Sequence, residues 1–491
     1  MALKTSLLAT GQLDEIIAHI LRRARIPGAA LAIVLGEKTV FAKGYGQRDL
    51  EARLPLTAAT VYPIASTSKA INATLIGMLV DEGRLAWDAP VQTYLPSFRL
   101  GDTVLSTQVT LRDLIVMRTG LPRHDWLWLQ NPISRAQIAR CLQHLELAAP
   151  FRTRFQYNNL TVCTAGHIAE IVTGKSWEAL VQERLLDPLG MKNTFFALPQ
   201  REDVTRSYLE NAHRELVLAP RLLSEVAAPS GGAMHSTIED MARWMAFNLA
   251  GGRQDGRALV QARTLLEIHS PQIPARSDPS CPTPHASYAM GWFVDTYNGH
   301  VRISHGGYLH AVNSDVSLFP QHQLGLICFT NFGPPPVTRL INQHAFDLLA
   351  GCEPVETVEQ KLAEYEKKVA ATSQRNSSVR RTENTAPSHR LADYTGTYVH
   401  PGYGPFGVEL RGGRLELQRH GLTLPLDHWH YDVWSVADND LFEIHRPHAF
   451  DRASRVVFET DADGQICGLA FPLEAEVPPV RFAKQSEANS S

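Results

Sequence analysis

Segments with the composition of β-strands occur in two groups, one near the N-terminus and one between residues 288 and 330, with a helical section between them. Residues 29–36 and 39–46 are apolar and β-branched, and the turn-like Gly36-Glu37-Lys38 separates them, which predicts an antiparallel hairpin. The later strand-like segments are residues 288–296, 301–304, 314–319 and 324–330. Strands on both sides of a helical middle predict one antiparallel sheet that is assembled from both groups.

The section between the two groups has helical periodicity. Apolar residues between 71 and 79 recur at the spacing of one helix face, and the pattern ends near Gly83. Further helices are predicted at residues 111–117, 160–172 and 177–186, and a closing helix at residues 346–350. The predicted fold class is therefore α/β (α+β), with an antiparallel sheet flanked by helices plus an all-helical region.

The C-terminal part has a different pattern. Residues 355–371 have helical composition, whereas residues 372–388 are polar and lack apolar periodicity, as in a linker. Beyond them, short apolar stretches alternate with Gly, Asp and Pro turns, which predicts a second, small β-barrel domain. These stretches are residues 396–399, 408–410, 414–417, 441–444 and 456–458. The predicted division is a large domain over residues 1–354, a helix and linker over 355–388, and a barrel over 389–485.

Composition narrows the choice of partners. The 491 residues are 44% hydrophobic and 20% charged with a formal net charge of -3, so no nucleic-acid partner is expected. The apolar patch near the N-terminus is too short for a secretion signal, and no segment approaches the apolar run that a spanning helix needs, so we expect no membrane association and a cytoplasmic location. The six cysteines lack paired short spacings, and neither a metal nor a cofactor is predicted.

Candidate catalytic residues begin with Ser66-Thr67-Ser68-Lys69 at the start of the first predicted helix. A spacing of three residues places the hydroxyl of Ser66 and the amine of Lys69 on one helix face. Serine becomes a good nucleophile only when a neighbour takes its proton, and a helix N-terminus directs unpaired N–H groups at the oxyanion that forms on attack. This arrangement suits acyl transfer.

Two more motifs follow in order, Tyr157-Asn158-Asn159 and His305-Gly306-Gly307. With Ser66-Thr67-Ser68-Lys69 they resemble, over about residues 15–350, the signature of the serine β-lactamase and penicillin-binding-protein superfamily. The closest resemblance is to its class C β-lactamase-related esterase and D-aminopeptidase branch, peptidase family S12. Thr119-Gly120-Leu121-Pro122 and Tyr288-Ala289-Met290-Gly291-Trp292 are similar to this family too. Residues 393–398 look like the start of the lipocalin-like barrel that some members carry.

The resemblance implies a β-lactamase/transpeptidase-like fold and a role for each motif residue. Ser66 would be the nucleophile, with Lys69 and Tyr157 as a coupled proton-handling unit. Asn159 would bond the amide of the substrate, and the backbone N–H groups of Ser66 and Tyr308 would form the oxyanion hole.

The third motif would also bind substrate, through His305, Gly306 and Gly307. Most β-lactamases have a lysine where this chain has His305, and a neutral imidazole offers no permanent charge to the carboxylate of a β-lactam. This difference favours the esterase and D-amino-acid amidase branches.

The sequence thus predicts a serine hydrolase that cleaves amide or ester bonds of a small or peptide substrate, possibly one with a D-amino acid, through an acyl-Ser66 intermediate. An acyltransferase or peptide cyclase with the same acyl-enzyme, and a true β-lactamase, remain alternatives. A binding or sensor protein without turnover is a further alternative, although a binder has no need for a coupled base. The chain could also form a homo-oligomer.

Overall fold

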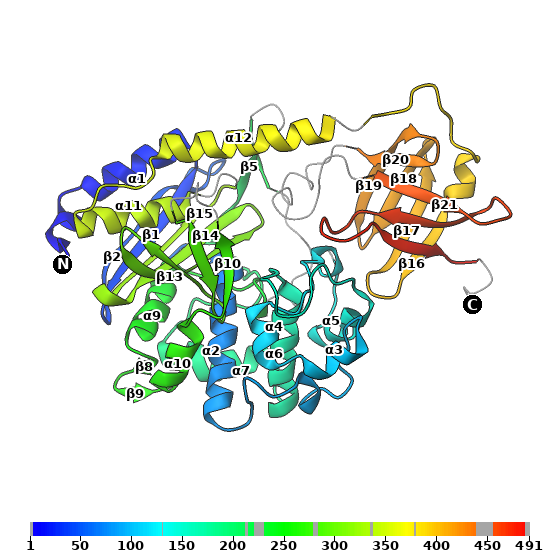
Figure 1. The fold of residues 1–491 in the computed structure, drawn as a ribbon. Coiled ribbons are helices and arrows are strands. Elements are labelled where there is room, and N and C mark those ends of the chain that lie inside the picture. Colours follow the sequence, from blue (N-terminus) through cyan, green and yellow to red (C-terminus); the bar gives the residue numbers. More distant parts are fainter. Residues whose placement is uncertain are drawn as a thin grey trace.

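The computed structural model describes residues 3–129, 131–211, 215–219, 230–277, 283–333, 337–377, 380–437 and 455–486. A large sheet with helices on both faces occupies the N-terminal part, and a separate closed barrel occupies the C-terminal part (Figure 1). The helix α12 (Val358–Ser377) runs from the first part towards the second (Figure 1). The predicted fold class, an antiparallel sheet with helices plus a small β-barrel, is confirmed.

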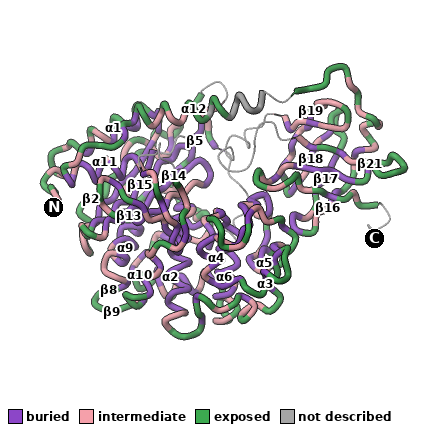
Figure 2. The backbone as a smooth tube through the Cα atoms, viewed as in Figure 1, coloured by how far each residue is buried: buried purple, intermediate pink, exposed green. Residues whose placement is uncertain are grey.

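The sheet joins strands from both ends of the large domain. Its order is β10-β11-β12-β13-β14-β15-β1-β2-β3, and its neighbouring strands are antiparallel. The strands are β1 (Gly28–Leu35), β2 (Lys38–Asp49), β3 (Leu54–Pro55), β10 (Ile273–Ser277), β11 (His285–Tyr288), β12 (Phe293–Tyr297), β13 (His300–Leu309), β14 (Val312–Phe319) and β15 (Leu324–Thr330). Both faces of β1, β14 and β15 are buried, which explains the nearly continuous apolar runs of β1 and β15 (Figure 2).

Helices cover the two faces of the sheet differently. On one face lie α1 (Gln12–Arg23), α11 (Thr338–Ala350) and α12 (Figure 1). The other face packs against α9 (Ile238–Leu249). The buried helix α2 (Ser68–Asp81) lies between this side of the sheet and the helical region. The remaining α-helices are α3 (Thr103–Gln108), α4 (Leu111–Val116), α5 (Arg135–Cys141), α6 (Asn159–Thr173), α7 (Trp177–Val181), α8 (Asp187–Leu189) and α10 (Ala262–His269).

Some element boundaries differ from those the sequence predicts. The segment 288–296 contains the end of β11 and most of β12, with a turn between them in which Gly291 has a φ of +79°. The predicted strand 301–304 continues to Leu309, so the third motif lies inside β13. The helix α12 extends to Ser377, into the segment interpreted as a linker.

The C-terminal barrel is closed and its strands follow one another in chain order, with β23 returning to β16. Its strands are β16 (Gly396–His400), β17 (Gly404–Arg411), β18 (Arg414–Arg419), β19 (Leu422–His430), β20 (Val433–Val436), β21 (Arg455–Thr460), β22 (Ile466–Phe471) and β23 (Val480–Lys484). The stretch 441–444 lies outside the described residues. Every second side chain along a strand points inward and fills the barrel, as the burial of alternate residues in β18 shows.

No helix among the described residues combines the length and the apolar character needed to cross a membrane.

Candidate active site

Ser66 lies in a short 3-10 turn, Ala65–Thr67, immediately before α2. The hydroxyls of its neighbours are used locally, because Thr67 Oγ1 donates to Ile64 O (2.8 Å) and Ser68 Oγ donates to Ala65 O (2.7 Å). Ala65 adopts a left-handed conformation with φ of +50°, which costs an ordinary residue about 1 kcal/mol. Of the three consecutive hydroxyl residues Ser66, Thr67 and Ser68, only Ser66 therefore lines the cavity described below.

Lys69 lies one helical turn after Ser66 and is buried. Its Nζ donates to Ser66 Oγ at 3.0 Å, to Asn159 Oδ1 at 2.7 Å, and to the backbone oxygen of Gly231. The amide oxygen of Asn159 and the carbonyl of Gly231 can only accept, so they bind two N–H groups of the amine. The third position, towards Ser66, can hold either an N–H or a lone pair that accepts the serine proton.

Tyr157 completes the group of polar side chains around Ser66. Its hydroxyl donates to Ser66 Oγ at 2.7 Å, and Lys69 Nζ lies 4.9 Å from the centre of its ring. Tyr157 precedes α6, where Asn158 is the N-cap and accepts from Thr161 N at 2.8 Å. The structure thus brings Ser66, Lys69, Tyr157 and Asn159 together at the N-terminal ends of α2 and α6.

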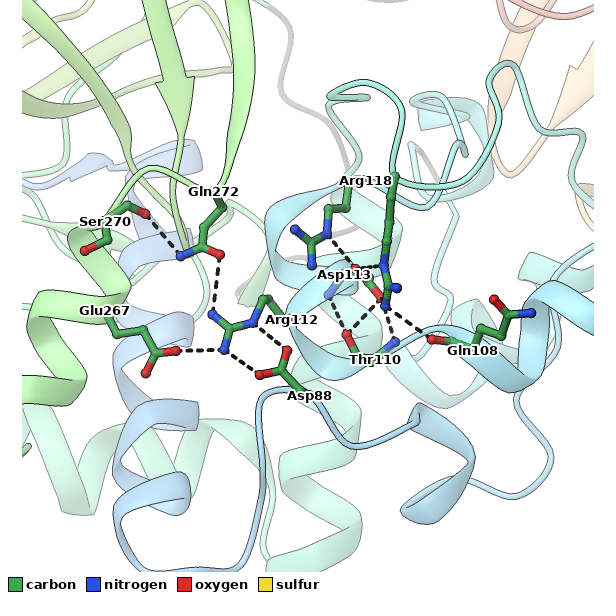
Figure 3. Close-up of polar contacts among 10 residues, drawn as sticks. Asp88, Gln108, Thr110, Arg112, Asp113, Arg118, Glu267, Ser270 and Gln272 are labelled. Carbon is green, nitrogen blue, oxygen red and sulfur yellow. Dashed lines mark hydrogen bonds and ion pairs between the residues drawn. The ribbon is translucent and has the colours of Figure 1, made fainter.

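A buried carboxylate at the start of α4 fixes the segments that lead to Tyr157 (Figure 3). Asp113 accepts from the backbone and hydroxyl of Thr110 in a capping box, and it forms ion pairs with Arg118 (2.6 Å) and Arg152 (2.7 Å). Burial opposes its charge, but these partners outweigh burial and lower the pKa of Asp113. Because Arg152 lies shortly before Tyr157 in the chain, the carboxylate ties this segment to the first turn of α4.

The third motif lies on β13, next to the turn that carries Ser66. The pairing of β13 with β12 ends at Ser304, whereas its pairing with β14 continues to Leu309. A Cβ at Gly307 would lie 2.7 Å from Ile64 O and 2.9 Å from Ala65 Cβ, so only glycine allows this approach. Gly306 has space for a Cβ, with its nearest neighbour at 3.6 Å. Gly307 thus serves the packing of β13 against the turn that carries Ser66.

His305 is buried at the back of the cavity. Its ring centre lies 5.3 Å from that of Phe293, 5.9 Å from Tyr288 and 6.2 Å from Tyr157. Burial, with a smaller contribution from the positive charge of Lys69, lowers the pKa of His305 to about 3. The imidazole is therefore neutral at pH 7 and does not imitate the lysine that most β-lactamases have at this position.

All of the predicted site residues except Lys69 line one cavity of about 660 Å³. Lys69 is buried and contacts the lining residues Ser66 and Asn159. Sequence reasoning missed three contributors, namely Arg123, Asp125 and the carbonyl of Gly231. Asp125 accepts from Asn159 Nδ2 at 2.9 Å and from Arg123 Nε at 2.6 Å. The position of Arg123 and Asp125 directly after Thr119-Gly120-Leu121-Pro122 is a signal that could have found them, whereas no local pattern marks the carbonyl of Gly231.

Apolar side chains form much of the cavity wall, including Trp128, Leu129, Phe293 and Leu309. Trp126, by contrast, packs in the core. Within the part of the chain that the structure describes, no cluster of three or more His, Cys, Asp or Glu side chains could hold a metal ion.

Comparison with known proteins places this site in a family. The model of the Beta-lactamase family matches residues 13–350, which is well over half of the chain and includes all of the motif residues. The chain belongs to the Beta-lactamase family. A second model, described as a domain of unknown function (DUF3471), matches residues 380–484 and so covers the barrel of this Beta-lactamase family member.

Relatives of this Beta-lactamase family member share about a quarter of its residues. The Unguisins hydrolase ungD' of Aspergillus campestris is 27% identical over 415 residues, which cover 79% of this chain and 76% of the relative. Protein flp of Staphylococcus aureus is 27% identical over 364 residues, 72% of this chain and 69% of the relative. The octameric penicillin-binding protein homologue from Pyrococcus abyssi has the same fold, with a TM-score of 0.64, 21% identity, and coverage of 97% of this chain and 100% of that one.

Proposed function

We propose that the chain is a serine hydrolase that cleaves an amide or ester bond of a small or peptide substrate through an acyl-Ser66 intermediate. The observation that carries this proposal is the convergence of Lys69 Nζ (3.0 Å) and Tyr157 Oη (2.7 Å) on Ser66 Oγ. A general base must lie within hydrogen-bond reach of the proton that it removes, and both groups satisfy that condition. The family match and a relative that is named a hydrolase support the same chemistry.

The two basic groups act as one unit in this mechanism. When the Ser66 hydroxyl attacks the substrate carbonyl, its proton passes to Tyr157 as a phenolate or to Lys69 as a neutral amine. The cation on Lys69 next to the ring stabilises a phenolate, so one proton shared between the two groups suffices. The same proton then goes to the leaving amine or alcohol when the tetrahedral intermediate collapses, and water repeats the sequence in deacylation.

The backbone N–H groups of Ser66 and Tyr308 would bind the oxyanion that forms on attack. Support comes from β13, which loses its β12 neighbour after Ser304 and so leaves one edge of residues 305–309 towards the cavity. The close packing allowed by Gly307 holds this edge next to the nucleophile turn. Donors fixed in this way before the reaction lower the barrier without reorganisation.

The cavity wall supports a proposal for the substrate class. Its aromatic and aliphatic side chains favour an apolar acyl or side-chain group, and the neutral His305 disfavours efficient β-lactam turnover. We propose that the chain belongs to the esterase and D-aminopeptidase branch, peptidase family S12, and that its barrel is a lipocalin-like domain. The octameric fold neighbour makes self-association a further part of the proposal, which light scattering of the purified chain would test.

Covalent labelling tests the central claim. A fluorophosphonate probe should modify the wild type on the peptide that contains Ser66, as mass spectrometry of a digest would show. The variant Ser66→Ala should not be labelled, and the matched variant Ser68→Ala, whose hydroxyl bonds Ala65 O, should keep the modified peptide. Equal labelling of Ser66→Ala would disprove the proposal.

A second experiment addresses the proton unit and the alternative of acyl transfer. Tyr157→Phe removes only the hydroxyl, so the acylation rate with p-nitrophenyl esters should fall by roughly 100-fold or more, as expected for loss of general acid-base catalysis. An unchanged acylation rate would assign the base to Lys69 alone. Product analysis with an added amine separates hydrolysis from transfer, since a strict hydrolase gives no amide product.

A further inference from the structure

The loop between α4 and α5 brings a charged pair to the reacting groups. Within it, Asp125 is buried and its Oδ1 accepts from Asn159 Nδ2 (2.9 Å) and from Trp128 Nε1 (2.8 Å), while its Oδ2 accepts from Arg123 Nε (2.6 Å). Asn159 is the residue that bonds Lys69. A chain of hydrogen bonds therefore leads from Arg123 through Asp125 and Asn159 to the catalytic amine.

Arg123 is oriented rigidly but keeps donors available. Its Nε is held by Asp125, and its Cζ lies 4.8 Å from the centre of the Tyr157 ring. The side chain lines the cavity and is 25% exposed. Among the described residues, neither of its η nitrogens has a hydrogen-bond partner. A guanidinium fixed in this way presents its two η nitrogens as a fork, the geometry that binds a carboxylate through two parallel hydrogen bonds.

The C-terminal barrel holds the loop in this conformation. His124, between the two charged residues, adopts a left-handed φ of +46°, which a non-glycine residue keeps only when its surroundings fix it. Its backbone N–H donates to Glu474 Oε2 at 2.8 Å. Its Nδ1 bonds the hydroxyl of Tyr403 at 2.7 Å and its Nε2 bonds Glu146 O at 2.9 Å, so Nε2 carries the proton and Tyr403 donates.

A third barrel contact lies one residue beyond Asp125. The guanidinium of Arg419, which is buried, donates to Trp126 O and also to Tyr403 O at 2.8 Å. Tyr403, Arg419 and Glu474 thus bond positions on both sides of Asp125. Since these residues come from separate parts of the barrel, only the folded barrel can supply all three contacts.

We infer that Arg123 binds a carboxylate of the substrate and that the barrel, through Tyr403, Arg419 and Glu474, positions it to do so. This inference rests on the proposed acyl-Ser66 chemistry and adds its substrate class, an acyl compound or peptide that carries a carboxylate near the scissile bond. The third motif cannot take this role, because His305 is neutral and already bonded to Gly306 O (2.6 Å) and Tyr288 Oη (3.2 Å). Arg123 offers the fixed positive charge from a different loop.

Matched pairs of esters test the inference. On the acyl side, p-nitrophenyl hemiglutarate carries a carboxylate that p-nitrophenyl valerate lacks. On the leaving-group side, the acetyl ester of 3-hydroxybenzoate carries one that the acetyl ester of 3-hydroxybenzamide lacks. For at least one pair, the ratio of kcat/KM for the anionic ester to kcat/KM for the neutral ester should fall roughly tenfold in Arg123→Gln. This is the low end of the effect expected for the loss of one charged hydrogen bond, because the side chain of Arg123 is partly exposed. Arg123→Lys should lie between the two.

The outcomes are distinct from those of the labelling experiment. If Ser66 is still labelled but Arg123→Gln lowers both members of each pair equally, Arg123 acts through Tyr157 and the carboxylate role is wrong. An equal or larger fall of the ratio in Arg276→Gln, which changes another arginine of the cavity, would place the carboxylate elsewhere. If no fluorophosphonate labels Ser66, the proposed function itself is wrong.

The role of the barrel needs its own variants. Tyr403→Phe combined with Glu474→Ala removes both contacts to His124 and should lower the same ratio about threefold. The matched control is Tyr398→Phe, which deletes a buried barrel hydroxyl that bonds Tyr394 O within the barrel. Thermal unfolding of each variant verifies that the barrel is folded. If the double variant matches the control while Arg123→Gln lowers the ratio, the positioning role of the barrel is refuted.

Discussion

Acid should destabilise the large domain through His305, and the size of the effect follows from its burial. The ordinary pKa of histidine is about 6.5, so the unfolded chain binds a proton near that pH, whereas the buried imidazole of the native chain binds one only near about 3. The unfolded state therefore binds more protons between these values, and stability falls as the pH drops. The contribution is fully present above pH 6.5 and is lost towards pH 3.

The magnitude at pH 5 comes from the same two values. At 1.5 units below the ordinary pKa, protonation favours the unfolded state by about 2 kcal/mol, since one pKa unit is worth about 1.4 kcal/mol. Replacing the imidazole by a group that does not titrate, as in His305→Asn, removes this term. The difference in unfolding free energy between pH 8 and pH 5 should therefore be about 2 kcal/mol smaller in the variant than in the wild type.

Urea unfolding followed by circular dichroism at pH 8, 7, 6 and 5 measures this difference. Other titrating groups, including His269 and His400, whose burial lowers the pKa of each to about 4, are common to both chains and cancel. Tyr288→Phe keeps the ring and removes only the hydroxyl that bonds His305, so it should retain the steep pH dependence of the wild type. Identical losses in the wild type and His305→Asn would show that the native imidazole is protonated normally, and would refute the argument from burial.

Three further changes test how the site is supported. Gly307→Ala would place a Cβ 2.7 Å from Ile64 O, so kcat/KM with p-nitrophenyl esters should fall at least about tenfold. The loss should be smaller in the control Gly306→Ala, where the atom nearest to the new Cβ is 3.6 Å away. Equal losses in the two variants would contradict the packing role of Gly307. Asn158→Ala removes the N-cap of α6 and a donor to Pro122 O, which should cost roughly 2 kcal/mol of unfolding free energy in urea, whereas Asn158→Ser, which keeps a capping oxygen, should cost less. Asp113→Asn breaks the ion pairs with Arg118 and Arg152 and should cost roughly 3 kcal/mol at pH 7. Because the native pKa of Asp113 is lowered, its stabilisation is present above about pH 4 and is lost as the pH falls through the native pKa. The unfolding free energies of the wild type and Asp113→Asn should therefore converge in acid. A difference that stays constant with pH would show that the charge of Asp113 is not the stabilising feature.

The fold and the central residues of the site were accessible from sequence because they depend on local pattern. The period of apolar residues after Ser66 predicts α2, which the structure contains at Ser68–Asp81. The two groups of strand-like segments on either side of the helical section predicted one sheet, because apolar strands from both groups need neighbouring strands with which to pair.

Other features depend on contacts between distant residues and left no local pattern. Arg123 is held at the site by the left-handed conformation of its neighbour His124. His124 in turn bonds Tyr403 and Glu474 of the barrel, which lie 279 and 350 positions after it in the chain. The state of His305 follows from the aromatic rings packed around it, which its own motif does not reveal. The two glycines of the third motif are alike in sequence, but only Gly307 approaches the turn that carries Ser66 closely enough to exclude a side chain.

The position of β1 in the sheet has a consequence for biosynthesis. Residues Gly28–Leu35 pair on one side with β2, which follows at once, and on the other with Leu324–Thr330, which leave the ribosome much later. Until then the apolar hairpin has an open edge, and such edges pair with other chains. Ser66 and Lys69 are likewise made long before β13 and the barrel. A nascent chain therefore carries Ser66 and Lys69 without the strand and the barrel contacts that complete the candidate site, which can assemble only after β13 and the barrel have left the ribosome.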